Sequence, residues 1–171
     1  MEDLKRAIRD IPDFPKKGIL FKDITPLLQD GVLFRQAINR LGDQFAEQRV
    51  DVVVGIEARG FLFAAALAYK LGAGVVIVRK PGKLPYKTHH VTYALEYGTD
   101  SLEIHQDAIK PGQRVLIVDD VLATGGTVKA TAELIEKFDA HICGVAFLIE
   151  LTFLNGREKL KDYDLTTLIT F

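Results

Sequence analysis

Two adjacent acidic residues, Asp119 and Asp120, end the apolar run RVLIVDD, and the loop ATGGT (123–127) follows two residues later. Carboxylates attract cations and accept hydrogen bonds from hydroxyl groups. The two glycines leave the backbone free to approach an anion, and the amides at the start of the helix predicted next favour phosphate. The two threonine hydroxyls add further donors. A ligand that carries both a polyol and a phosphate would satisfy the two halves of this segment.

Each half of this segment also has a simpler interpretation. Turns rich in Gly and Thr are common between a strand and a helix, and adjacent acids can simply solvate the end of a strand. The combination of both halves within nine residues is more specific. The lysine of a nucleotide-binding P-loop, GxxxxGK[ST], is missing, and so is the GxGxxG pattern of dinucleotide-binding proteins, so neither kind of nucleotide site is indicated.

Bulk composition predicts a single domain over residues 1–171 with a full hydrophobic core. The sequence is 48% hydrophobic and its formal net charge is −1. Without a strong overall field, we expect no nucleic-acid or membrane partner, and any anion site must be local. Cys143 is the single cysteine, which excludes an internal disulfide framework and fits a reducing compartment. The charged first ten residues do not resemble a signal segment, so a cytoplasmic location is predicted.

The hydrophobic pattern predicts an α/β fold with a central, mostly parallel sheet flanked by helices. Continuous Val- and Ile-rich runs predict buried strands at 50–56, 74–78, 114–120 and 141–150. Helical spacing of apolar residues predicts helices in the opening segment up to Ile11 and at 34–45, 60–72 and 127–138. Residues 13–28 are expected to be irregular or extended. Strands that alternate with helices indicate a sheet covered on both faces, with ligands bound beyond the carboxyl ends of its strands.

The segment from Arg79 to Glu96 has a different character, with two prolines, several basic residues and the pair His89–His90. We expect a long loop that leads into a hairpin with a return strand at 101–109, and loops of this length are usually functional. Consecutive histidines point apart in a strand and lack partners at ligand spacing, so we interpret them as exposed loop residues rather than metal ligands.

The segment VLIVDDVLATGGT resembles the signature of the type I phosphoribosyltransferases, which bind 5-phosphoribosyl-1-pyrophosphate (PRPP). Five further blocks resemble, in the same order, the adenine phosphoribosyltransferases of that family: FPKKGILFKDITPLL, VVVGIEARGF, VRKPGKLP, LEYG and the late ELT. The blocks run from about residue 14 to residue 152 and so cover nearly the whole chain. The resemblance implies the type I phosphoribosyltransferase fold, in which residues 1–33 and the C-terminal part form a small hood over the active site and 79–105 form a mobile hairpin loop.

The resemblance implies that the acidic pair holds the ribose hydroxyls, directly or through a Mg²⁺ ion that it contacts indirectly, by way of PRPP or water. The 5′-phosphate would lie in the loop Ala123, Thr124, Gly125, Gly126 and Thr127. Pyrophosphate would bind the turn Glu57, Ala58 and Arg59, with a cis peptide before Ala58, and the basic residues Arg79, Lys80 and Lys83. In the family some of these basic residues come from a neighbouring subunit, so a homodimer is implied.

The resemblance places the base between Phe21 and Leu151, with main-chain contacts near Leu20 and with Lys22 beside them. Two residues depart from the family pattern: Lys22 stands where an arginine is common, and Lys17 replaces a frequent proline. The first departure could loosen the purine preference, although the charge is kept. Glu96 and Tyr97 would lie on the mobile loop that closes over the site, and together with Arg59 they complete the implied catalytic set.

The implied reaction is adenine + PRPP → AMP + pyrophosphate, a Mg²⁺-dependent step of purine salvage. It would proceed by displacement at ribose C1 through an oxocarbenium-like transition state. Two alternatives remain at this stage. One is transfer to another purine, such as xanthine or hypoxanthine, and the other is a non-catalytic PRPP-sensing regulator on the same fold. Such regulators usually carry an added DNA-binding domain or a basic patch, and neither is evident in this sequence.

Overall fold

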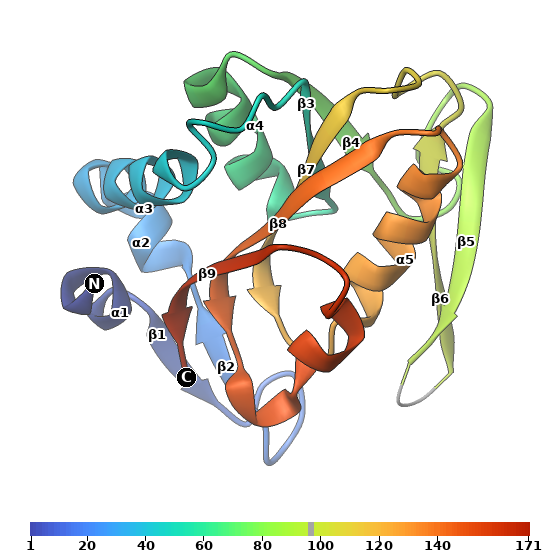
Figure 1. The fold of residues 1–171 in the computed structure, drawn as a ribbon. Coiled ribbons are helices and arrows are strands. Elements are labelled where there is room, and N and C mark those ends of the chain that lie inside the picture. The colour runs from blue at the N-terminus through green and yellow to red at the C-terminus, as the bar shows by residue number, and fades with distance from the viewer. Residues whose placement is uncertain (96–97) are drawn as a thin grey trace.

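The computed structural model describes residues 1–95 and 98–171 and is built around one parallel sheet (Figure 1). The five strands are β3 (Val52–Ile56), β4 (Gly74–Val78), β7 (Arg114–Leu122), β8 (His141–Glu150) and β9 (Leu165–Thr170). Their order is β4-β3-β7-β8-β9, and every neighbouring pair is parallel. The predicted α/β fold with a parallel central sheet is confirmed, and β9 is a fifth strand that the sequence pattern did not reveal.

Helices cover both faces of the sheet, which explains why its strands are continuous apolar runs. Helices α3 (Gly31–Asp43) and α4 (Gly60–Leu71) pack on one face, and α5 (Gly126–Glu136) packs on the other. Val53 belongs to the cluster under α3 and α4, while its neighbour Val54 belongs to the cluster under α5. Successive side chains of a strand point to opposite faces of the sheet. When both faces are covered, every position of the strand is buried and is therefore occupied mainly by apolar residues.

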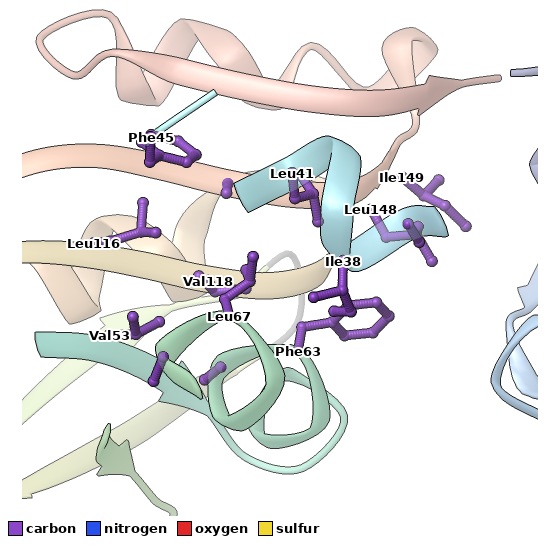
Figure 2. Packing of buried hydrophobic residues seen from close by; sticks show 14 of the residues in the cluster. Ile38, Leu41, Phe45, Val53, Phe63, Leu67, Leu116, Val118, Leu148 and Ile149 are labelled. Carbon is purple, nitrogen blue, oxygen red and sulfur yellow. The ribbon is translucent and has the colours of Figure 1, made fainter. Parts of the chain in front are cut away.

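The core on the α3–α4 side is formed by large side chains from two helices and three strands (Figure 2). The residues labelled there are Ile38, Leu41 and Phe45 from α3 and the turn after it, Phe63 and Leu67 from α4, and Val53, Leu116, Val118, Leu148 and Ile149 from the sheet. Local signals define the helix ends. The Asp30 side chain accepts from the amides of Val32 and Leu33 at the start of α3, and Gly72 ends α4 with φ +67°.

The N-terminal segment differs from the prediction. Helix α1 (Glu2–Arg6) is short, and Ile11 lies in strand β1 (Arg9–Pro12) rather than in a helix. Strand β1 pairs antiparallel with β2 (Leu20–Asp23), so that Ile11 is opposite Phe21. The helical spacing was therefore misleading beyond Arg6, because pairing with a strand ten residues further on competes with local helix formation. Residues 20–23 are extended as predicted, but the short helix α2 (Thr25–Gln29) was not expected.

The segment after β4 forms the hairpin of β5 (Thr88–Ala94) and β6 (Thr99–His105), which lies along α5 (Figure 1). The return strand thus ends earlier than the predicted 101–109. His89 was interpreted as an exposed loop residue, but it lies in β5, is partly buried, and packs its ring edge-to-face on Phe138 at a centroid distance of 5.3 Å. Two short 3₁₀ helices, η1 (Thr152–Leu154) and η2 (Gly156–Leu160), connect β8 to β9. Among the described residues, none of the helices combines the length and apolarity required to cross a membrane.

Candidate active site

A cleft of about 570 Å³ opens at the carboxyl ends of β3 and β7, where ligands bind in parallel α/β sheets. Strand β2, the turn after β3, the hairpin, the end of β7 and the residue after β8 all contribute to its lining. The residues that line it are Ile19, Leu20, Phe21, Lys22, Glu57, Ala58, Arg59, Lys80, Tyr93, Leu95, Asp100, Asp119, Asp120, Val121, Ala123, Thr127 and Leu151.

Asp119 and Asp120 lie on the wall of this cleft, although β7 continues past them to Leu122. Asp120 is 4% exposed, and its Oδ2 lies 2.6 Å from Nε of Arg59 without a hydrogen bond of good geometry among the described residues. Burial, and next the charge of Asp120, raise the pKa of Asp119 well above its ordinary value, and burial also raises the pKa of Asp120. The pair is therefore an acceptor site whose charge the fold only partly compensates.

The loop after β7 surrounds a second, smaller cavity of about 70 Å³. It is lined by all five residues of the predicted phosphate loop, Ala123, Thr124, Gly125, Gly126 and Thr127. Gly125 has φ +77° immediately before α5, and a Cβ there would lie 2.6 Å from the carbonyl oxygen of Gly156. Glycine is thus required both by the left-handed backbone and by the close approach of η2. The cavity combines backbone amides, hydroxyls and a helix start, which suits a phosphate group.

Tyr93 and Asp100 of the hairpin were not predicted as site residues, yet both line the cleft. The Tyr93 hydroxyl lies 3.2 Å from Thr127 Oγ1 and donates to Asp100 Oδ2 at 3.3 Å, and Asp100 also forms an ion pair with Lys80. Burial raises the pKa of Tyr93, so its hydroxyl keeps its proton. This chain of contacts links the hairpin to the phosphate loop. Since Tyr93 meets Thr127 across 34 residues, the local pattern carried no signal for it.

The turn after β3 gathers the basic residues of the segment that follows β4. Its Glu57–Ala58 peptide is cis, as the family resemblance implied. Glu57 Oε2 accepts from Arg79 Nε at 3.3 Å and from the Lys80 amide at 2.9 Å, and Oε1 pairs with Lys83. Although burial acts against it, these donors lower the pKa of Glu57 to about 2. Lys80 lines the cleft, whereas Arg79 and Lys83 lie around the Glu57 carboxylate at its side.

The four residues predicted to hold the base, Leu20, Phe21, Lys22 and Leu151, all line the cleft. Phe21 packs edge-to-face against Phe14 at a centroid distance of 5.1 Å, and the Arg59 guanidinium lies 5.3 Å from the Phe21 ring centre. These contacts form an apolar slot with one charged rim, which suits a flat heterocycle with polar edges. Glu96 and Tyr97, the other two predicted catalytic residues, lie outside the described residues.

Among the described residues, no cluster of three or more His, Cys, Asp or Glu side chains could enclose a metal ion. The acidic pair nevertheless offers hard oxygen donors, including the buried Asp120 Oδ2, which among the described residues has the Arg59 ion pair but no hydrogen bond. Mg²⁺ is typically bound through one or two carboxylates together with substrate phosphates and water. The residues present therefore fit an ion that arrives with its substrate.

Comparison with known proteins agrees with this geometry. The family model of the phosphoribosyl transferase domain matches residues 28–170. The adenine phosphoribosyltransferase of Trichlorobacter lovleyi is 60% identical over 171 residues, which is the full length of both chains. That of Thermotoga neapolitana is 59% identical over 169 residues, 99% of each chain.

Solved structures give the same result. The crystal structure of adenine phosphoribosyltransferase from Thermoanaerobacter pseudethanolicus matches with a TM-score of 0.97 and 57% identity over 99% of each chain. The Saccharomyces cerevisiae enzyme, solved with an imino-altritol bisphosphate and adenine, matches with a TM-score of 0.91 and 44% identity, covering 97% of this chain and 96% of its own. The chain therefore belongs to the type I phosphoribosyltransferase family and, within it, to the adenine phosphoribosyltransferases.

Proposed function

We propose that this chain transfers the 5-phosphoribosyl group of PRPP to adenine and releases AMP and pyrophosphate, a reaction of purine salvage. The observation that carries the proposal is that a carboxylate pair, a cationic turn and an apolar slot line one cleft, and that the glycine-rich helix start lines a small cavity which shares Asp119 and Thr127 with it. Each of these matches one part of the two substrates. The relatives named as adenine phosphoribosyltransferases support adenine as the base.

The roles of the residues follow from their chemistry. The phosphate loop holds the 5′-phosphate, and Asp119 and Asp120 accept from the ribose hydroxyls. Arg59 and Lys80, with Arg79 and Lys83 beside the cleft, donate to the pyrophosphate as negative charge builds on it. The turn residues Glu57 and Ala58 shape this subsite. Donors aimed at developing charge are a large source of rate enhancement in water-excluded sites.

Adenine lies between Phe21 and Leu151, with polar contacts from the main chain at Leu20 and with Lys22 behind it. Leaving-group departure runs ahead of attack, so the ribose passes through an oxocarbenium-like state without a covalent enzyme intermediate. Residues 1–33 and the C-terminal part act as the hood, and the hairpin of 79–105 closes to keep water from PRPP. Glu96 and Tyr97 are assigned to the closing loop from the family resemblance.

Mg²⁺ is the proposed cofactor, held by Asp119 and Asp120 through PRPP or water. When bound, it would neutralise charge on the pyrophosphate leaving group. The chain acts in the cytoplasm without a nucleic-acid or membrane partner, in keeping with its net charge of −1.

An exposed apolar face supports the proposed homodimer. Leu62 and Tyr69 on α4 are 48% and 92% exposed, and Val75 and Ile77 on β4 are 46% and 38% exposed. Val75 pairs with Val53, whose side chain packs under α4, so these residues share the α4 side of the sheet. β4 is also an edge strand. Apolar faces of this kind are typical of subunit interfaces.

The proposed function is tested by incubating the protein with PRPP, Mg²⁺ and one base at a time and measuring pyrophosphate release. We expect rapid release with adenine and release slower by at least about 100-fold with hypoxanthine or xanthine, since these place a hydrogen-bond acceptor where adenine has a donor. Chelation of Mg²⁺ should abolish the reaction. Release with none of the bases would favour the regulatory alternative, and a preference for hypoxanthine would move the chain to a different substrate class.

Arg59→Ala removes one donor from the proposed pyrophosphate subsite. We expect kcat to fall by about 10²–10³-fold, the usual effect of deleting a donor aimed at developing charge. Arg35→Ala, at an exposed position on α3, is the matched control and should leave kcat unchanged. Steady-state kinetics with circular dichroism to verify folding would check this, and near-normal turnover of folded Arg59→Ala would remove Arg59 from the mechanism.

Asp119→Asn should stabilise the folded chain and weaken the binding of PRPP. Folding raises the pKa of Asp119, so ionisation of this carboxyl destabilises the folded chain relative to the unfolded one. The loss of stability is absent below the unfolded pKa of about 3.8 and grows as the pH rises through the pKa of the folded state. Asparagine keeps the oxygen that accepts from the Asp120 amide. We expect the free energy of unfolding of the variant to exceed that of the wild type by about 1 kcal/mol at pH 7, which would raise Tm by roughly 2–4 °C. This difference should shrink towards pH 4. The KM for PRPP should rise. Denaturant unfolding at both pH values checks the sign, and a variant less stable at pH 7 would contradict it.

The dimer is tested by sedimentation velocity at micromolar concentration. Ile77→Asp buries a charge in the proposed interface and should shift the protein from dimer to monomer. Val32→Asp, at a 57% exposed apolar position on α3 that is not one of these four residues, should remain dimeric. A wild-type protein that sediments as a monomer would exclude the dimer. An Ile77→Asp variant that still dimerises would place the interface elsewhere.

A further inference from the structure

Phe171, which follows β9, contacts the structure behind both walls of the slot assigned to adenine. One wall is the hood strand β2, with Phe21 and Lys22, and the other is Leu151 after β8. These walls come from opposite ends of the sequence. Phe171 belongs to none of the motifs that point to a site in the sequence, and it is not among the residues that line the cleft.

On the hood side, the contact of Phe171 runs through Lys22. The Lys22 ammonium lies 3.8 Å from the centre of the Phe171 ring and 2.6 Å from Asp10 Oδ1. The Lys22 side chain is only 9% exposed, so the ring and the carboxylate are its main partners in place of water. A second ammonium, that of Lys5, lies 4.7 Å from the ring centre and donates to the Thr170 carbonyl at 2.7 Å. Desolvated ammonium groups bind aromatic faces more strongly than exposed ones do.

On the opposite side, the contacts of Phe171 are made by its backbone. Its amide donates to the Glu150 carbonyl at 3.0 Å, and its carbonyl oxygen accepts from the Thr152 amide at 2.9 Å and from Thr152 Oγ1 at 2.7 Å. These bonds flank Leu151 on both sides in the sequence and so hold its backbone in place.

We propose that Phe171 is a positioning residue that sets the width of the adenine slot by holding Lys22 against one wall while its backbone fixes Leu151 in the other. This inference rests on the proposed function, because it assumes that the base lies between Phe21 and Leu151. The spacing of the two walls determines how closely a flat ring is stacked. Loss of the ring of Phe171 therefore weakens binding of the base and leaves the phosphate loop intact.

The test is the kinetics of Phe171→Leu, which keeps the apolar volume but removes the aromatic face. We expect KM for adenine to rise about five- to tenfold, the size of one cation–π contact, while KM for PRPP and kcat at saturation stay within about twofold. Phe171→Tyr keeps the ring and should restore the wild-type KM. Phe34→Leu, at a half-buried aromatic residue of α3 that packs edge-to-face on Phe63 outside the cleft, is the matched control and should change neither KM.

A second variant, Lys22→Met, keeps the side-chain stem and removes the ammonium. If Lys22 and Phe171 act through one contact, the double variant should raise KM for adenine no more than the larger single effect. The inference would be overturned if folded Phe171→Leu had an unchanged KM for adenine or if its KM values for adenine and PRPP rose equally. It would also be overturned if the effects of Phe171→Leu and Lys22→Met on the KM for adenine were additive. In each of these cases the wild-type protein still uses adenine; failure of the wild type with adenine would instead overturn the proposed function.

Discussion

Two carboxylates held side by side at the end of a buried strand are the constraint on which the rest of the site depends. Burial raises the pKa of both Asp119 and Asp120, and the charge of Asp120 raises the pKa of Asp119 further. The fold brings the turn after β3 close enough for Arg59 to reach Asp120. This approach is possible because Gly60 has no side chain: a Cβ there would lie 2.8 Å from Asp119 Oδ1. The start of α4 and the acidic pair are therefore positioned against each other by backbone contact.

All four cations assigned to PRPP are paired with carboxylates of the chain itself: Arg59 with Asp120, Lys80 with Asp100, and both Arg79 and Lys83 with Glu57. Binding of a phosphate must compete with these pairs, so the affinity for PRPP is a difference between two sets of ionic contacts. Exchange at Arg59 would free Asp120 to accept from a ribose hydroxyl. A small inorganic anion could replace one carboxylate but could not supply the hydroxyls, so this arrangement favours a ligand that carries both groups.

The sequence predicted the parts of the fold whose signals are local. The strand 52–56 is buried throughout, and such continuous apolar runs are diagnostic when both faces of a sheet are covered. Strand β9 is threonine-rich and mostly half-buried, so its pattern was weak. Ile11 fitted a helical spacing, but pairing with β2 determined its structure. In the cleft, the acidic pair and the phosphate loop were evident from their chemistry, whereas Tyr93 and Gly156 meet that loop from distant segments and carried no local signal.

The segment after β8, whose structure the sequence did not predict, joins the two ends of the proposed substrate site. Through η2, Gly156 packs against the phosphate loop, and two bonds of 2.7 and 2.8 Å from Arg157 to the buried Glu150 hold that turn in place. Glu150 directly precedes Leu151 of the base slot. The cavity proposed for phosphate and the slot proposed for the base are therefore fixed to the same short stretch of chain. A reaction at ribose C1 requires this, because the carbon lies between the two subsites and small errors in their separation reduce the rate strongly.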